Sequence, residues 1–147
     1  GNLQNYAPRL HGNFKPVGQT DSEQAFCWLM QELAKSHASV PTVSELSLTL
    51  SELVPQIAQH GSFNFLLSNG QALWAHASTQ LHYVLRRHPF TQATLSDEDV
   101  SVNFADVTRE TDRVAVVVTA PLTTDEAWTA LKPGRVYTFE DGDLNPP

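Results

Sequence analysis

TDSEQAFCWLMQEL, residues 20–33, carries both a start signal for a helix and an apolar stripe. Thr20 and Glu23 stand at the spacing of a capping box, in which each side chain bonds the backbone of the other residue. Large apolar side chains then recur at helical spacing: Phe26, Leu29, Met30 and Leu33. We predict a helix over residues 20–37 that buries this stripe.

The next segment repeats these signals and predicts a second helix over residues 42–60. Thr42 and Glu45 form another capping-box pair. The apolar stripe consists of Val43, Leu46, Leu50, Leu53, Val54 and Ile57. Gly61 has the place of a C-terminal cap, and Pro55 is expected to end or kink the helix near its last turn. The two helices are expected to pack together.

The pattern after residue 61 changes from helices to strands. Asn69-Gly70 is a strong signal for a hairpin turn. The predicted strands are 63–67, 73–77, 81–85, 100–104, 113–119 and 135–139. The valine-rich run 114–118 predicts a strand buried on both faces, and residues 125–131 predict a short helical turn. Helices followed by strands indicate an α+β fold with antiparallel sheets and the helices on one side.

Composition and charge exclude several classes of protein. The 147 residues suffice for one domain with a sizeable core. Lys and Arg number 9 and Asp and Glu 16, so the net charge is −7 and a nucleic-acid partner is not expected. The longest apolar run spans the six residues 25–30, far short of a membrane span. The single cysteine cannot form an internal disulfide, which fits a reducing compartment such as the cytoplasm.

Standard catalytic and metal-binding patterns do not occur in the sequence. There is no glycine-rich phosphate loop, and the six histidines lack metal-ligand spacing, so no metal and no cofactor are expected. His76 and His82 lie in neighbouring predicted strands, where a packing or surface role is expected. Cys27 lies between Phe26 and Trp28, so it is expected to be an inert, buried thiol. The acidic end at residues 140–143 is expected to be a solvated tail.

Asp21 is the residue for which two interpretations stay open. It stands at the first position of the predicted helix, where a carboxylate complements the helix dipole by about 0.3–1 kcal/mol. Alternatively, a carboxylate at the end of a loop binds the ammonium group of a ligand. Periodicity alone favours the helix-cap interpretation.

Several segments resemble the class II glutamine amidotransferases, most closely the small bacterial stand-alone, YafJ-type subgroup. These segments are GNLQNY (1–6), GNFKPVGQTDSEQAFCWL (12–29), FNFLLSNG (63–70), TQLHY (79–83) with Arg86-Arg87, and APLT (120–123) with Trp128 and Pro133-Gly134. The resemblance runs from residue 1 to about 139, and the block 20–23 is its most specific piece.

The resemblance implies an Ntn-hydrolase fold, a four-layer αββα sandwich, of which this chain would form the C-terminal portion. In that family an N-terminal cysteine attacks the side-chain amide of glutamine, forming a thioester and releasing ammonia. An Asn-Gly pair supplies the oxyanion hole, and an aspartate in a T-D-[ST]-E block binds the α-amine of glutamine. Gly1 matches the glycine of that pair and Asp21 the aspartate, which makes substrate binding the favoured role of Asp21.

Residues 1–147 are accordingly expected to be the C-terminal part of a single glutamine amidotransferase domain. The nucleophilic cysteine, the carboxylate-binding arginine and the oxyanion asparagine would lie upstream of Gly1, so this chain alone is expected to be inactive. The expected partners are glutamine, the upstream part of the same domain and an unidentified ammonia acceptor, with no membrane. The alternatives are a catalytically inactive α+β association module and, more weakly, an amide hydrolase with another substrate. An upstream Met-Cys start would favour the enzyme.

Overall fold

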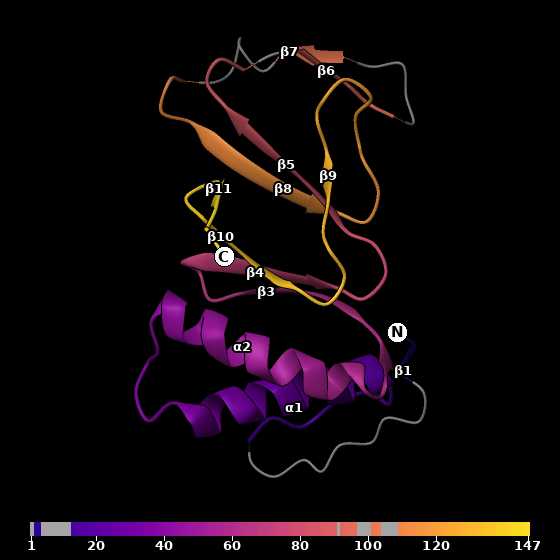
Figure 1. The fold of residues 1–147 in the computed structure, drawn as a ribbon, viewed down its shortest axis with the longest axis vertical. Coiled ribbons are helices and arrows are strands. Elements are labelled where there is room, and N and C mark those ends of the chain that lie inside the picture. Colours follow the sequence, from indigo (N-terminus) through magenta and orange to yellow (C-terminus); the bar gives the residue numbers. More distant parts are fainter. Residues whose placement is uncertain (1, 4–12, 91, 97–100, 104–108) are drawn as a thin grey trace.

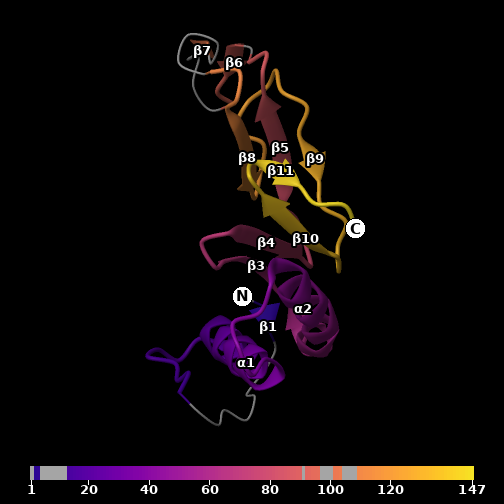
Figure 2. The ribbon, with the colours of Figure 1, turned by 90° about the vertical axis from the view of Figure 1, so that its left-hand side faces the viewer.

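Three layers make up the part of the chain that the computed structural model describes, residues 2–3, 13–90, 92–96, 101–103 and 109–147. Two helices form the first layer, and two antiparallel sheets stacked on it form the others (Figure 1). Figure 2 shows the same order from the side, with the first sheet between the helices and the second sheet. The α+β prediction with antiparallel sheets is confirmed.

The helices are α1 (Asp21–Ser36) and α2 (Val43–Ala58). They lie side by side, as predicted, and they run in opposite directions (Figure 1). Both begin at a threonine N-cap, and α2 has a complete capping box between Thr42 and Glu45. α1 buries Ala25, Leu29 and Leu33. The predicted stripe was therefore wrong at one end, because the side chain of Phe26 is 46% exposed.

The end of α2 differs in part from expectation. Pro55 does not itself end the helix, which continues to Ala58 within the last turn, and the alternative of a kink at Pro55 stays a prediction. A proline this close to the C-terminus removes a single intrahelical hydrogen bond, and packing of Leu53, Val54 and Ile57 outweighs that loss. Gly61 is not the cap either, because Gln59 is the C-cap and Gly61 begins a strand.

The first sheet packs directly on the helices and has the strand order β11-β10-β4-β3. Its strands are β3 (Asn64–Ser68), β4 (Ala72–Ala77), β10 (Val136–Glu140) and β11 (Asp143–Leu144). Asn69-Gly70 closes the β3–β4 hairpin as predicted: Gly70 has a φ of 88°, and Asn69 Oδ1 accepts bonds from the backbone N–H groups of Gln71 and Ala72. A separate ladder pairs β1 (Asn2–Leu3) with β2 (Gly61–Ser62).

The second sheet has the strand order β8-β5-β9. Its strands are β5 (His82–Arg87), β8 (Arg113–Val118) and β9 (Thr129–Ala130), and a small ladder joins β6 (Gln92–Thr94) to β7 (Ser101–Asn103). β8 lies at the edge of its sheet, and Val114 is 44% exposed, so the prediction of a strand buried on both faces was wrong.

Two further segments differ from expectation. Residues 125–131 contain β9 and bends in place of the predicted helical turn. The acidic residues 140–143 are not a solvated tail, because they form the turn between β10 and β11. The predicted strand 100–104 is seen only as β7, since its two end residues lie outside the described part.

The first sheet separates two apolar cores. On the helix side, Ala72 and Trp74 of β4 pack with the buried faces of α1 and α2. On the other side, Ala75 and Ala77 pack with Tyr137, Phe139 and residues of the second sheet. The alternation of side chains along β4 thus joins the layers into one structure.

A buried polar contact fixes α2 on the first sheet. Trp74, which is fully buried, donates from Nε1 to Ser47 Oγ at 2.9 Å. Ser47 Oγ lies 2.8 Å from the carbonyl of Val43 and 3.0 Å from Thr138 Oγ1 on β10. One hydroxyl thereby links α2 to two neighbouring strands.

Replacing Ser47 with Ala is expected to lower the free energy of unfolding of the full-length protein by about 1–3 kcal/mol, because a buried indole N–H loses its acceptor. Urea unfolding measures the change. Ser51→Ala is the matched control one turn later, where the hydroxyl is exposed and bonds the carbonyl of Ser47. Its expected effect is within about 0.5 kcal/mol, and equal losses for both variants would contradict the role of Ser47.

Candidate functional site

Asp21 is the first residue of α1, directly after the N-cap Thr20. Thr20 Oγ1 accepts a hydrogen bond from the Glu23 backbone N–H at 3.2 Å, and Asp21 Oδ1 accepts one from the Ser22 backbone N–H at 2.8 Å. Asp21 is half-buried at this helix start. The positive end of the helix dipole stabilises the ionised carboxylate. This setting suits both interpretations of Asp21, helix capping and binding of an ammonium group.

Glu23 departs from the capping box that the sequence predicted. Its carboxylate reaches back to the preceding loop, where Oε1 accepts from the backbone N–H of Val17 at 2.6 Å. The N–H of Gly18 lies 3.0 Å from Oε1 and 2.9 Å from Oε2. The threonine half of the box is therefore present, while the glutamate binds the turn that leads into the helix.

The first strand of the chain lies near this helix start. β1 contacts α1 and pairs with β2 at the end of the molecule where α1 begins (Figure 1). Gly1 itself lies outside the described residues, so its assignment to an oxyanion hole stays a prediction. The strand that follows Gly1 is nevertheless placed at the same end as Asp21.

Cys27 is buried in α1, as expected from its apolar neighbours. Its relative exposure is 9%, and Ala25 and Leu29 of the same helix lie in the core beside the first sheet. A buried thiol of this kind lacks the exposed, electropositive surroundings of a reactive cysteine.

A second polar cluster joins residues from separate segments that carried the family resemblance. Arg86 of β5 forms a two-pronged ion pair with Glu126, with Nε–Oε2 and Nη2–Oε1 distances of 2.8 and 2.7 Å. Thr123 Oγ1 donates to Glu126 Oε1, and Trp128 Nε1 donates to Thr123 Oγ1, both at 2.8 Å. Sequence patterns did not predict a role for these residues, because Arg86 and Glu126 are 40 positions apart. The only sequence signal for the Arg86–Glu126 ion pair is that both residues lie in or beside segments that resemble the family.

The Arg86–Glu126 cluster is shielded from solvent, and both of its ionisable side chains are charged. The side chains of Arg86 and Glu126 are 17% and 11% exposed. The hydrogen bonds from Arg86 lower the pKa of Glu126, so this carboxylate is ionised at neutral pH. A cavity of about 240 Å³ lies beside the cluster, lined by Phe90 and Asp125 among others. Both charged groups of the ion pair bond each other, which favours a structural role in fixing the 121–131 segment on β5.

The histidines take up packing and linking positions. His76 is fully buried on β4, where its ring packs against both Phe63 and Phe65, and burial lowers its pKa, so the ring is neutral at pH 7. His82 lies on β5 in the other sheet, where Nδ1 is 3.2 Å from the carbonyl of Thr119. The expected packing or surface role fits both positions.

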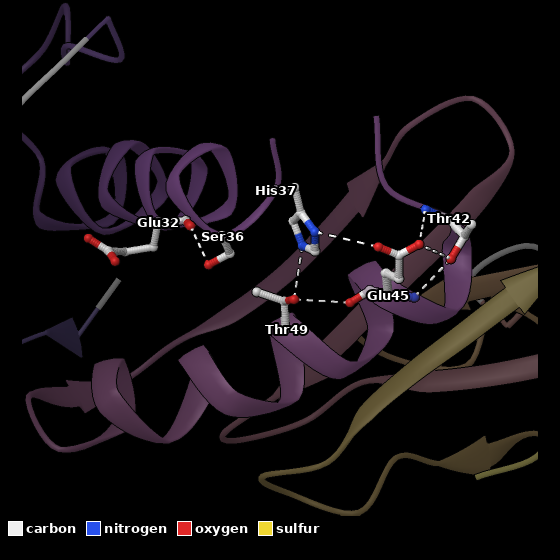
Figure 3. A network of polar contacts seen from close by, with 6 residues as sticks. All are labelled: Glu32, Ser36, His37, Thr42, Glu45 and Thr49. Carbon is white, nitrogen blue, oxygen red and sulfur yellow. Dashed lines mark hydrogen bonds and ion pairs between the residues drawn. The ribbon is translucent and has the colours of Figure 1, made fainter. Parts of the chain in front are cut away.

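His37 joins the C-terminal end of α1 to α2 (Figure 3). Its Nε2 lies 3.0 Å from Thr49 Oγ1 and its Nδ1 lies 3.8 Å from Glu45 Oε2. The order hydroxyl–imidazole–carboxylate looks like a catalytic triad, but the Thr49 hydroxyl donates to the backbone carbonyl of Glu45. His37 therefore donates to Thr49 and takes no proton from it, the reverse of nucleophile activation.

A groove of about 570 Å³ lies next to His37, between the α1–α2 connection and the β3–β4 hairpin. Its lining is mainly apolar, including Met30, Leu33 and Trp74. Within the described ranges, no group of three or more His, Cys, Asp or Glu side chains could hold a metal ion. No helix in this part of the chain is long and apolar enough to cross a membrane.

Comparisons with known proteins agree with the resemblance seen in the sequence. The family model "Glutamine amidotransferases class-II" matches residues 1–146. The chain is 42% identical over 140 residues to "Putative glutamine amidotransferase YafJ" of Escherichia coli, covering 95% of this chain and 55% of that protein. It is 38% identical over 143 residues to a Haemophilus influenzae protein named "Putative glutamine amidotransferase", covering 97% and 49%.

A solved structure gives the same result for the fold. The crystal structure of a "predicted glutamine amidotransferase" from Pseudomonas aeruginosa superposes with a TM-score of 0.86 at 34% identity, covering 99% of this chain and 57% of the other. The chain thus spans about half the length of the relatives it matches. From the family model, the sequence identities and the shared fold, we conclude that the chain belongs to the class-II glutamine amidotransferases.

Proposed function

We propose that the protein containing residues 1–147 hydrolyses the side-chain amide of glutamine to glutamate and ammonia. An N-terminal cysteine, upstream of this chain, attacks the amide carbon, and its free α-amine serves as the base. The tetrahedral intermediate collapses with loss of ammonia to a thioester. Water then cleaves the thioester, releasing glutamate and regenerating the thiol. A reducing compartment such as the cytoplasm suits this thiol chemistry.

Two residues of this chain have roles in that reaction. The carboxylate of Asp21 binds the α-ammonium group of glutamine and so orients the substrate. The backbone N–H of Gly1 contributes to the oxyanion hole beside an upstream asparagine side chain. A metal or other cofactor is not needed for either step. An ammonia acceptor is a further partner in this proposal.

The setting of Asp21 is the observation that carries the proposal. Its carboxylate stands at the start of α1, at the end of the molecule that also holds β1 (Figure 1). Membership of the family and the matching T-D-S-E block support the same role. The buried position of Cys27 supports a nucleophile outside residues 1–147.

The test compares residues 1–147 alone with the full-length protein. The lone chain is expected to release no ammonia from glutamine and to aggregate, since β3 is an edge strand among the strands that the structure describes, and Leu66 and Val114 are half-exposed. The full-length protein is expected to be soluble and to release glutamate and ammonia in equal amounts. Coupled assays for both products and light scattering measure these differences.

Two outcomes would contradict the proposal. Glutamine hydrolysis by residues 1–147 alone would remove the need for an upstream nucleophile. A full-length protein that neither binds nor hydrolyses glutamine would favour the second candidate, an inactive association module of the same fold. The buried state of the one cysteine in the sequence fits this candidate as well as an upstream nucleophile, so the activity of the full-length protein separates the two.

A further inference from the structure

The turn before α1 is held by hydrogen bonds to one carboxylate. Glu23 accepts from the backbone N–H groups of Val17 and Gly18, at distances of 2.6 to 3.0 Å. The side chain of Val17 is fully exposed, so burial of that side chain contributes nothing to the position of the turn. The Glu23 carboxylate, together with the Thr20 N-cap, therefore holds the path of the chain just before Asp21.

The absence of a side chain at Gly18 allows the closeness of this contact. A Cβ atom at position 18 would lie 2.5 Å from Glu23 Oε2, well inside van der Waals contact. The atom it would meet is the end of a flexible side chain, so an alanine at 18 displaces the carboxylate and leaves the backbone in place. Gly18 and Glu23 thus form one unit, which we call the Gly18–Glu23 lock.

The lock acts on the residue that we propose to bind substrate. Asp21 lies between Gly18 and Glu23 in sequence, in the first turn of α1, whose backbone N–H groups have no carbonyl partner from a preceding turn of helix. The two backbone donors bind both oxygens of Glu23, so this carboxylate is directed at the preceding turn. The position of that turn sets where the chain enters α1 at Asp21.

We propose that Glu23 is a positioning residue for glutamine binding: through the lock with Gly18 it holds the Asp21 carboxylate in the orientation that accepts the substrate's α-ammonium group. This inference rests on the proposed function. It differs from an ordinary helix-capping role, which α2 illustrates. Glu45 occupies the same third position of α2 and bonds its own N-cap, Thr42, in a complete capping box. The start of α2, where Glu45 lies, is at the opposite end of the helical layer from the start of α1 (Figure 1).

The experiment measures kcat and KM of the full-length protein for glutamine and for glutaramic acid, which lacks the α-amine. Glu23→Ala is expected to raise the KM for glutamine by about 3- to 30-fold with a smaller change in kcat, because substrate binding loses a preset orientation. Glu23→Gln keeps one acceptor oxygen and should show a smaller increase. Gly18→Ala should act in the same direction although it retains the Glu23 charge. Glutaramic acid kinetics should be the same in all variants.

The matched control is Glu45→Ala, which removes a glutamate from the same helical position of α2. It is expected to lower the melting temperature without changing the KM for glutamine. In an Asp21→Asn background, Glu23→Ala should add little, because the two residues act through one interaction. Circular dichroism confirms that each variant is folded.

The outcomes distinguish failure of the positioning role of Glu23 from failure of the proposed function. If Asp21→Asn weakens glutamine binding but Glu23→Ala and Gly18→Ala do not, the positioning role is wrong and the proposed function stands. Equal losses for glutamine and glutaramic acid would also overturn it, since a general structural defect affects both substrates. If the unaltered full-length protein does not act on glutamine, the proposed function fails and the positioning role fails with it.

Discussion

Replacing Asp21 with Asn is expected to lower kcat/KM for glutamine by about 10- to 100-fold in the full-length protein. A hydrogen bond to a charged group contributes roughly 1.5–3 kcal/mol, and about 1.4 kcal/mol corresponds to a factor of ten. The substituted amide keeps the size of the side chain but loses the charge that attracts an ammonium group. Steady-state assays of ammonia release give the ratio directly.

The helix-cap interpretation of Asp21 predicts a different result. Asparagine at the start of α1 loses only about 0.3–1 kcal/mol of interaction with the helix dipole, which affects stability and leaves activity nearly normal. Glutaramic acid is the control substrate, because wild type and Asp21→Asn should treat it alike if Asp21 binds the amine. Unchanged glutamine kinetics in the variant would return Asp21 to the role of a helix-terminal charge.

The helices could be predicted because their signals are local. Thr20 and Thr42 mark both starts, and the apolar stripe of α2 faces the core as expected. Phe26 shows the limit of this reasoning. Two adjacent stripes of α1 contain apolar side chains, and only the packing on the first sheet decides that Ala25 is buried and Phe26 half-exposed.

In the sheets, only the pairing of strands that are joined by a short turn could be predicted from the sequence. Asn69-Gly70 fixed the β3–β4 hairpin because the turn conformation is local. The burial of β8 depends on how many strands flank it, which its valines do not reveal. The acidic residues 140–143 look like a tail in sequence. In the structure they connect β10 to β11, which pair with each other. Backbone pairing stabilises the short strand β11 even though the turn is acidic.

The candidate site shows the same division between local and distant contacts. Asp21 was identified from a four-residue block, and its place at the helix start follows from the capping signal. The hydrogen bonds that Glu23 accepts from the backbone of Val17 and Gly18 could not be predicted from the sequence. The capping-box spacing pointed instead to Thr20, which is closer in sequence. The pairing of Arg86 with Glu126 brings together β5 and a segment 40 residues later, which requires the folded sheet.

Replacing Arg86 with Met is expected to lower the free energy of unfolding of the full-length protein by about 3 kcal/mol at pH 7, because Glu126 would remain as a nearly buried charge without its partner. Thr123 would still donate to Glu126, but a hydroxyl does not neutralise a carboxylate. Arg87→Met is the matched control at the next position. Arg87 pairs with Asp143 at the surface, where the side chains are 49% and 38% exposed, so the expected loss is only about 0–1 kcal/mol.

The pH dependence separates the charge of Glu126 from the packing of Arg86. Because the hydrogen bonds from Arg86 lower the pKa of Glu126 in the folded protein, the ion pair contributes its full stability above the unfolded pKa of about 4.3. That contribution is lost as the pH falls through the lowered folded pKa. In Arg86→Met the buried carboxylate takes up a proton at higher pH, so the difference between wild type and variant should shrink as the pH falls from the raised pKa of Glu126 in the variant to its lowered pKa in the wild type. Urea unfolding between pH 3 and pH 7 measures it, and a difference that stays constant with pH would assign the loss to packing of the Arg86 side chain instead of to the uncompensated carboxylate.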